Sequence, residues 1–307
     1  AVDPAVAPLR ASFAGSLADA LRAAAAVLAS DPHPMATARF LAGHALALTP
    51  DAVLARLRDP FPAAARAAFD ASVRRVADGE PLAYVLGDQP FLDFALTVTP
   101  DVLIPRPETE ALALWAIKWA IEWANARRAA TAAPLRAADV GTGSGALAIA
   151  LARALPDGMI VAGDVSPAAL AVAADNADRL CGAGRVAFVE GDLFAPFNGS
   201  LQGPFDLIVA NLPYVGTDEI GDVAPSVLAF EPHGALFAGA DGLDLLRRLI
   251  ADLPGRLVPG GAAALEIGWR QGERVLALAA DAFPSAIVTL RDDPFGRPRF
   301  VTIETAR

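Results

Sequence analysis

The chain has 307 residues, 54% of them hydrophobic and 20% charged, so it can bury the core of one large domain or of two smaller ones. Its formal net charge is −10 and no basic run is visible, which disfavours a substrate held through nucleic-acid phosphates. Cys181 is the only cysteine, and the three histidines lack metal-ligand spacing, so we expect neither an intrachain disulfide nor a metal site. The sequence shows no membrane-length apolar run and no signal-peptide pattern. We therefore expect a cytoplasmic protein without membrane contact.

Residues 1–80 are predicted to form a small helical bundle with short connections. Ser16 is a helix-capping residue that precedes an alanine-rich segment, and Pro32 interrupts the helix that follows. Apolar residues at helical spacing continue in three further segments, which begin at Met35, Pro50 and Phe61.

Residues 81–105 are predicted to form a β-hairpin that links two domains. The segments 82–86 and 96–99 are strand-like, and the loop between them begins with Gly87-Asp88-Gln89-Pro90. The segment 112–124 is then predicted to be a helix. Its tryptophans recur every four residues, which favours core or interdomain packing over a base-stacking platform: Trp115, Trp119 and Trp123.

Residues 106–307 are predicted to form an α/β domain, because strands and helices alternate from residue 135 onward. The last two apolar runs, 286–290 and 299–303, are too close for a helical crossover, so we expect them to pair antiparallel. The fold class is thus a mostly parallel seven-stranded sheet with an antiparallel terminal hairpin, more typical of methyltransferases than of dehydrogenases. The other strands are expected near 136–141, 159–164, 185–190, 205–210 and 262–267.

A glycine turn follows the first strand of this sheet and predicts a nucleoside cofactor site. The pattern alone is weak, because Gly141, Gly143 and Ala146 also fit the dinucleotide motif with its permitted final alanine. A plain strand-to-helix turn is the structural alternative. The candidate residues are Gly141, Thr142, Gly143, Ser144 and Gly145.

Two carboxylates end the next strands and are further candidates for the cofactor. Asp164 can accept both ribose hydroxyl protons of a dinucleotide or of S-adenosylmethionine. Asp192 can accept from an adenine amino group, with a helix cap as its alternative role. Leu193 can pack on the adenine face.

A polar turn, Asn211-Leu212-Pro213-Tyr214, follows a buried strand and is the candidate catalytic motif. The Asn211 side-chain oxygen and the Leu212 main-chain carbonyl can accept the two N–H protons of a planar amide or amino group. Pro213 holds residue 212 extended, and Tyr214 can pack on the flat face of that group. With the glycine turn, the motif predicts methyl transfer to a planar nitrogen.

Three stretches carry a resemblance along essentially the whole chain to the release-factor glutamine methyltransferases, the PrmC/HemK family. They are Gly79-Glu80-Pro81-Leu82-Ala83-Tyr84-Val85-Leu86-Gly87, Val102-Leu103-Ile104-Pro105-Arg106-Pro107-Glu108-Thr109-Glu110, and Asn211-Leu212-Pro213-Tyr214 in place of Asn-Pro-Pro-Tyr. Phe230-Glu231-Pro232 and the segment from Gly239 to Asp244 also match.

The resemblance implies an N-terminal helical domain over 1–80 that grips a protein substrate, a hairpin linker over 81–105, and a Rossmann-like methyltransferase domain over 106–307. It implies methyl transfer from S-adenosylmethionine to the glutamine of the Gly-Gly-Gln motif in class 1 peptide chain release factors. The cofactor residues it implies are Gly141 to Gly145, Asp164, Leu193 and Asn211, and the glutamine-binding residues are Asn211 to Tyr214.

Two positions depart from the family pattern. Leu212 replaces the first proline of the motif, which costs stiffness but keeps the main-chain acceptor. Leu193 stands where relatives carry an aromatic, which weakens adenine stacking. The segment from Arg106 to Glu110 is expected to be mainly structural, because acidic residues in a first helical turn complement the helix dipole.

Four other functions compete with this interpretation. A glutamine methyltransferase acting on a ribosomal protein shares the motif, but the match from Pro105 to Glu110 favours the release factor. An adenine-N6 nucleic-acid methyltransferase uses a similar clamp, and the acidic charge disfavours it. The Asn211 turn and the terminal antiparallel strands disfavour a NAD-dependent dehydrogenase. The presence of Asn211 disfavours a cofactor-binding module without turnover.

Overall fold

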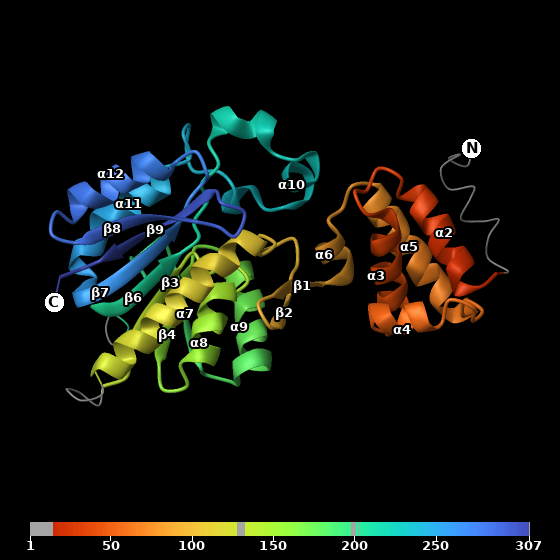
Figure 1. The fold of residues 1–307 in the computed structure, drawn as a ribbon, viewed down its shortest axis with the longest axis horizontal. Helices are drawn as coiled ribbons and strands as arrows, with labels where there is room; N and C mark the ends of the chain where they lie inside the picture. The colour runs from red at the N-terminus through yellow and green to blue at the C-terminus, as the bar shows by residue number, and fades with distance from the viewer. Residues whose placement is uncertain (1–14, 128–132, 198–200, 202, 307) are drawn as a thin grey trace. The chain divides into compact units, whose positions relative to one another are not determined.

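The computed structural model describes residues 15–127, 133–197, 201 and 203–306 (Figure 1). The chain divides into two compact units. The first unit contains the residues up to Gly87 together with Pro225–Phe230, and the second contains Asp88–Ala224 and the residues from Glu231 onward. The expectations for residues 1–14 lie outside the described residues.

The first unit is helical in its described part, as the spacing of apolar residues predicts. Ser16 caps the first helix: its hydroxyl accepts from the Asp19 main-chain N–H, and its own main-chain N–H donates to the Asp19 carboxylate. Leu21, Leu41 and Phe69 are among its fully covered core residues. Its helices are α2 (Leu17–Val27), α3 (Pro34–Leu46), α4 (Pro50–Ala55), η1 (Ala63–Ala65), α5 (Arg66–Ala77), α6 (Leu82–Leu86) and α10 (Pro225–Phe230).

The strand predicted over residues 82–86 is wrong, because these residues form the short helix α6. Pro81 precedes the helix, and Gly87 ends it in a left-handed conformation with φ 78°. Three consecutive residues, Ala83 to Val85, are buried, which a half-buried strand with alternating side chains does not allow. The flanking proline and glycine were the signals for a helix.

A β-hairpin is present, but with other strands than predicted: β1 (Asp88–Phe91) pairs antiparallel with β2 (Phe94–Thr97). The predicted strand 96–99 thus contributes only its first half. Asn176 of α9 (Pro167–Cys181) holds the hairpin within the second unit, since its side chain accepts from the Thr97 N–H at 2.8 Å and donates to the Thr97 carbonyl at 2.9 Å.

The second unit is built on a seven-stranded sheet in the order β5-β4-β3-β6-β7-β9-β8. The strands from β3 to β7 run parallel, and β9 pairs antiparallel with β8, as predicted. Strand β9 also pairs antiparallel with β7, which was not predicted. The strands are β3 (Arg136–Val140), β4 (Met159–Asp164), β5 (Val186–Glu190), β6 (Phe205–Ala210), β7 (Leu257–Glu266), β8 (Ile287–Asp292) and β9 (Pro298–Glu304).

Helices cover both faces of this sheet (Figure 1). Strand β6 is buried along its whole length, so that Leu207 and Val209 enter one core and Ile208 and Ala210 the other. The first core includes side chains of α7 (Pro107–Arg127), α8 (Ala146–Ala154) and α9 (Pro167–Cys181), and the second those of α11 (Asp244–Asp252) and α12 (Gly272–Ala282). Short 3₁₀ helices complete the unit: η3 (Thr217–Asp222), η4 (His233–Ala235) and η5 (Leu253–Gly255).

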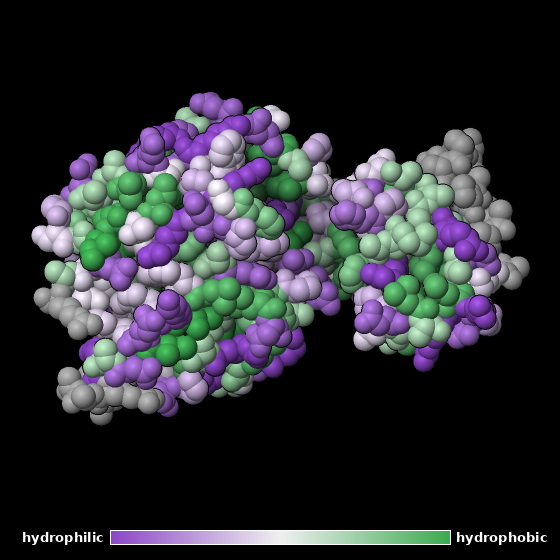
Figure 2. Space-filling view, viewed as in Figure 1, coloured by the Kyte–Doolittle hydropathy of each residue, from purple (hydrophilic) through white to green (hydrophobic). Residues whose placement is uncertain are grey.

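The tryptophan stripe lies along α7 and is half-buried against the first core. Trp119 stacks between its two neighbours, with ring centroids 6.5 Å from Trp115 and 5.3 Å from Trp123. Apolar side chains gather over α7 and α8 in Figure 2. The stripe is therefore a packing feature of the sheet's helical cover, as predicted.

The topology also fixes where a ligand fits. From β3 the chain moves outward to β4 and β5, and β6 then returns to the other side of β3. At such a reversal the loops diverge beyond the carboxyl ends of the strands and leave a crevice.

Candidate active site

A cavity of about 500 Å³ lies at this reversal. The residues after β3, β4, β5 and β6 line it, and segments around residues 101–109 and 232–235 complete its wall. Ten of the predicted site residues line it: Gly141, Thr142, Gly143, Ser144, Asp164, Asp192, Leu193, Asn211, Leu212 and Pro213. Gly145 and Tyr214 are not among its lining residues.

The glycine turn after β3 is closely packed against the Asn211 turn. Gly141 has φ +77°, and a Cβ there would lie 2.6 Å from a methyl carbon of Leu212. Gly145, with φ +87°, caps the start of α8. The two candidate motifs thus meet side by side at the cavity.

Asp164 ends β4 and organises the turns on both sides of it. One carboxylate oxygen accepts from the Gly143 N–H and the other from the Ser166 N–H, both at 2.9 Å. A carboxylate has about four lone-pair positions, so Asp164 retains capacity to accept from hydroxyl groups in the cavity.

Asp139 is a cavity residue that was not singled out from the sequence as a site residue. It is 1% exposed, and one oxygen accepts from the Thr142 hydroxyl at 2.7 Å and the Ala148 N–H at 3.1 Å. The other oxygen is buried without a partner. Burial raises the pKa of Asp139 to about 7. An unpaired acceptor of this kind fits a cationic or N–H group of a ligand.

Asp192 and Leu193 follow β5. Leu193 is nearly buried and has φ +48°, which turns the chain at the cavity wall. Asp192 forms an ion pair with Arg248 at 2.5 Å, and both side chains are about half exposed. The carboxylate therefore lies at the mouth of the cavity and not in its depth.

Asn211 presents a polar group whose orientation is defined. Its Nδ2 donates to the Thr109 hydroxyl of α7 at 3.1 Å. Its Oδ1 is buried and has no hydrogen-bond partner. Leu212 is 5% exposed, and Pro213 also lines the cavity. The turn therefore offers an unpaired side-chain acceptor at the wall of the cavity.

Tyr214 is not among the lining residues of this cavity. It lines a second cavity of about 400 Å³, together with Trp269, Gln271 and Arg299. Burial raises the pKa of the Tyr214 hydroxyl, and the charge of Glu266 adds to this effect. The phenol is thus neutral at ordinary pH.

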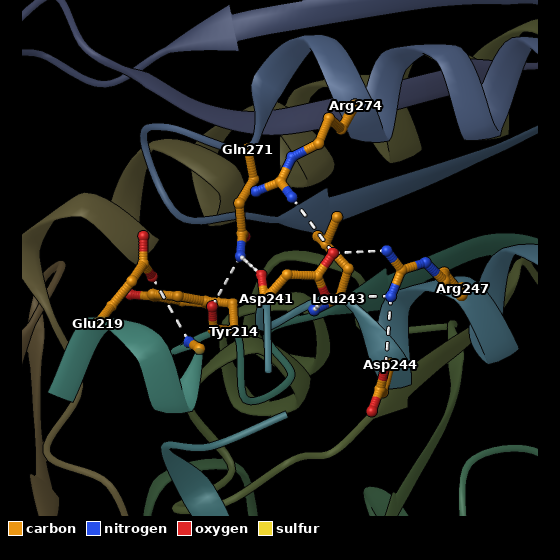
Figure 3. A network of polar contacts seen from close by, with 9 residues as sticks. Tyr214, Glu219, Asp241, Leu243, Asp244, Arg247, Gln271 and Arg274 are labelled. Atoms are coloured by element: carbon orange, nitrogen blue, oxygen red, sulfur yellow. Dashed lines mark hydrogen bonds and ion pairs between the residues drawn. The ribbon is translucent and has the colours of Figure 1, made fainter. Parts of the chain in front are cut away.

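The main chain of Tyr214 is held by a polar network (Figure 3). The Gln271 amide donates to the Tyr214 carbonyl at 2.8 Å and to the Asp241 carbonyl at 3.2 Å. The Asp241 carboxylate in turn accepts from Arg247 at 2.6 Å and pairs with Arg274 at 3.2 Å. The hydrogen bond from Arg247 lowers the pKa of Asp241. This network fixes the exit of the Asn211 turn, and Gln271 was not recognised from the sequence.

The segment from Arg106 to Glu110 makes mainly structural contacts, as expected. Arg106 pairs with the buried Glu231 at 2.5 Å, and Glu231 also accepts from the Ile104 N–H at 3.1 Å. Glu110 accepts from the Leu92 N–H of the hairpin at 2.9 Å. These contacts hold the start of α7, and with it Thr109, against the cavity.

Within the described ranges, no group of three or more histidine, cysteine, aspartate or glutamate residues is arranged to hold a metal ion. Over the same ranges, none of the helices is both long enough and apolar enough to cross a membrane.

Comparison with protein families gives two matches. The PrmC N-terminal domain matches residues 19–87, and a methyltransferase domain matches residues 137–229. Among curated proteins, the release factor glutamine methyltransferase of Bordetella pertussis is 42% identical over 266 residues, 86% of this chain and 93% of the relative. The protein of the same name from Cereibacter sphaeroides is 40% identical over 93% of this chain and 97% of its own length.

Among solved structures, the catalytic domain of hMettl16 in complex with the MAT2A 3′UTR hairpin 6 is similar in fold, with a TM-score of 0.51. It is 16% identical, and the match covers 78% of this chain and 82% of that one. This likeness concerns the fold alone.

Proposed function

The chain belongs to the release factor glutamine methyltransferases, and on that premise we propose that it methylates the side-chain amide nitrogen of the glutamine in the Gly-Gly-Gln motif of class 1 peptide chain release factors. The observation that carries the proposal is the Asn211 oxygen, a buried acceptor without a partner at the wall of a ligand-sized cavity. Such an enzyme acts in the cytoplasm, where release factors work.

The methyl donor we propose is S-adenosylmethionine, and the residues of the cavity fit it. Asp164 can accept from ribose hydroxyls, and the unpaired oxygen of Asp139 from an ammonium group. Leu193 offers an apolar wall to the adenine and Asp192 an acceptor at the mouth. The glycines at 141 and 143 let the main chain approach the ligand. When bound, the cofactor supplies an electrophilic methyl group on its sulfonium.

The substrate amide is a poor nucleophile, because its nitrogen lone pair is delocalised into the carbonyl. The chain's contribution is therefore to place this nitrogen and to stabilise the positive charge that develops on it. The Asn211 Oδ1 accepts one N–H and the Leu212 carbonyl the other, which fixes the plane of the amide. Both acceptors stand on a turn whose packing against Gly141 and Gln271 leaves little freedom.

Pro213 keeps the main chain extended at Leu212. Tyr214 stays a candidate for the flat face of the amide, although it lines the neighbouring cavity and not this one. The helical unit that contains residues 19–87 is the part we propose to hold the protein substrate, which its match to the PrmC N-terminal domain supports.

Transfer of a labelled methyl group tests the proposal. The purified chain, supplied with methyl-labelled S-adenosylmethionine, should label a class 1 release factor but not the variant whose Gly-Gly-Gln glutamine is alanine. Asn211→Ala should lower the rate at least about a hundredfold, because a charge-stabilising acceptor in a closed site is lost. Its affinity for the cofactor, measured by calorimetry, should change little.

Labelling of the release-factor variant would exclude the proposed acceptor. A ribosomal protein offered in parallel tests the nearest alternative. Preferential labelling of that protein would change the proposed substrate but not the proposed reaction.

A further inference from the structure

The second cavity, of about 400 Å³, adjoins the Asn211 turn and is not used by the proposed chemistry. Pro213 lines the first cavity and Tyr214, the next residue, lines the second. Consecutive Cα atoms are about 3.8 Å apart, so the two walls are close neighbours. A substrate chain that places one side chain in the first cavity can therefore reach the second with adjacent residues.

Gln271 fixes the wall of the second cavity relative to the Asn211 turn. Its Nε2 donates to the Tyr214 carbonyl at 2.8 Å (Figure 3), and its Oε1 accepts from the Gly268 N–H at 2.9 Å. Gln271 and Gly268 belong to the loop after β7, and both line the second cavity. The turn and this loop are thus held together before any substrate arrives.

Arg299 of β9 brings an incompletely paired cation to this cavity. Its side chain is 10% exposed, and its Nε is buried without a hydrogen-bond partner. The carboxylates of Asp293 and Glu108 lie 3.7 and 3.9 Å from its nitrogens, which is beyond ordinary hydrogen-bond length. A guanidinium presents several N–H donors in a fixed fork, so Arg299 retains the capacity to donate to a ligand.

The charges around the cavity favour a neutral ligand. Glu219 and Asp222 of η3 line it, and both pair with Arg270, Asp222 at 2.8 Å. These two carboxylates balance the charges of Arg270 and Arg299, and the two carboxylates beside Arg299 add negative charge. That surplus repels a phosphate or a free carboxylate, and Arg299 repels a cation. A peptide carbonyl is neutral and accepts from a guanidinium.

Trp269 gives the mouth of the cavity a flat apolar surface. It is 48% exposed, and the Arg270 guanidinium lies 4.5 Å from its ring centroid, which restrains the indole. Glycine has no side chain to keep a flat peptide group away from such a ring. The two residues before the glutamine of the proposed substrate are glycines, so their recognition must use the main chain.

We propose that the second cavity is a subsite for the main chain of the protein substrate beside the reactive glutamine. Arg299 donates to a carbonyl oxygen of that main chain, and Trp269 packs on an adjacent peptide group. This inference rests on the proposed function and adds to it a means of recognising residues that have no side chains.

Two variants with matched controls test the subsite. Arg299→Gln should raise the KM for the release factor about tenfold or more, because a charge-assisted hydrogen bond is lost. Trp269→Ala should raise it about fivefold. The controls are Arg291→Gln on β8 and Phe295→Ala in the loop between β8 and β9, neither of which lines the cavity. Both should stay within about twofold of the wild type.

A structural role of Arg299 is tested separately, because Arg299→Gln leaves Asp293 without its cation. Arg299→Lys keeps the charge and loses the fork, so it should unfold thermally close to the wild type and still raise the KM for the release factor about threefold or more. The affinity for S-adenosylmethionine, measured by calorimetry, should be unchanged in every variant. If the affinity for the cofactor falls together with that for the release factor, the role of Arg299 is structural and the subsite is wrong.

Double-mutant cycles with the release factor distinguish a main-chain contact from a side-chain contact. Alanine substitutions in the release-factor residues that flank the Gly-Gly-Gln motif should add to the effect of Arg299→Gln, because every residue keeps its carbonyl oxygen. Coupling of more than about threefold to an acidic residue would show that Arg299 binds a side-chain carboxylate, and would overturn the main-chain assignment.

A binding measurement without turnover separates failure of the subsite from failure of the proposed function. The Kd for the release factor, in the presence of S-adenosylhomocysteine, should rise in Arg299→Lys and Trp269→Ala as the KM does. If the wild type labels the release factor and both variants keep its KM and Kd, the subsite is wrong and the proposed function stands. If the wild type labels no release factor, the proposed function fails and the Kd decides the subsite: a rise in both variants supports it, and an unchanged Kd or no binding refutes it.

Discussion

At the scale of single residues, the site is built from acceptors that the protein leaves unpaired. The Asn211 Oδ1 and one oxygen of Asp139 are buried without partners, and both belong to residues of the cavity wall. Buried polar groups in proteins are almost always paired, and an exception at a cavity wall can be completed by a ligand or by water. On the proposed function, these two atoms cost the free protein stability and regain hydrogen bonds when the ligand binds.

Asp139 yields a prediction with opposite effects on stability and binding. Its pKa rises on folding from 3.8 to about 7, so the folded chain holds this proton more tightly than the unfolded chain. The free energy of unfolding therefore falls as the pH rises through this window. Asp139→Asn should stabilise the protein at pH 8 by roughly 2–4 kcal/mol, with little effect below pH 4.

The same variant should weaken binding of the cofactor, because the neutral amide attracts an ammonium group less. Thermal unfolding at both pH values and calorimetric titration with S-adenosylmethionine measure the two effects. If Asp139→Asn and the wild type were equally stable at pH 8, the argument from a buried charge would be wrong. If the two bound S-adenosylmethionine with the same affinity, Asp139 would not belong to the cofactor site.

The sequence revealed some of these residues and not others, for a physical reason. Asn211 and Asp164 could be predicted because they lie at the carboxyl ends of parallel strands, where the site forms. Thr109 reaches Asn211 from 102 positions away along the chain, and no local pattern carries that contact.

At the scale of elements, the candidate site depends on close packing between the glycine turn after β3 and the Asn211 turn after β6. Gly141 has the same φ, +77°, as Gly296 in the loop between β8 and β9. Around Gly296 a Cβ would meet nothing within 4 Å, whereas at Gly141 it would meet Leu212 at 2.6 Å. Substitutions at these two glycines therefore distinguish the effect of backbone strain, which both share, from the effect of packing against Leu212, which occurs only at Gly141.

We predict that Gly296→Ala loses about 1–2 kcal/mol of unfolding free energy from the left-handed backbone. Gly141→Ala should lose this amount and more, because its Cβ also displaces Leu212. Only Gly141→Ala should also lower the rate of methyl transfer, because Leu212 must move and its carbonyl moves with it. Chemical denaturation and single-turnover methyl transfer measure the two quantities. Equal loss of activity in both variants would show that the contact with Leu212 does not matter.

The sheet was largely predictable, since most of its parallel strands are mainly apolar runs separated by helical segments. The predicted segments 159–164 and 205–210 coincide with β4 and β6. Strand β7 begins at Leu257, earlier than predicted, because Pro259, Gly260 and Gly261 interrupt its apolar pattern. The pairing of β6 with β7 shifts register near this point. Helix α6 was missed because five residues are too few to show a helical period.

At the scale of the whole molecule, the charge separates this chain from enzymes that act on nucleic acid. With a formal net charge of −10, it lacks the overall attraction that phosphate binding requires. We predict no detectable methylation of adenine in single-stranded RNA or DNA at about 150 mM salt, under conditions in which the release factor is fully labelled. Labelled oligonucleotide at a comparable rate would overturn this and would favour the adenine-N6 alternative.

Helix α10 gives the architecture a consequence for biosynthesis. Pro225–Phe230 belongs to the first unit, although the chain has by then built much of the second. As the polypeptide leaves the ribosome from its N-terminus, the first unit cannot be completed when Gly87 emerges and must wait until residue 230 has been made. The two units are therefore not independent modules that mature one after the other; the last piece of the earlier one arrives only after strand β6.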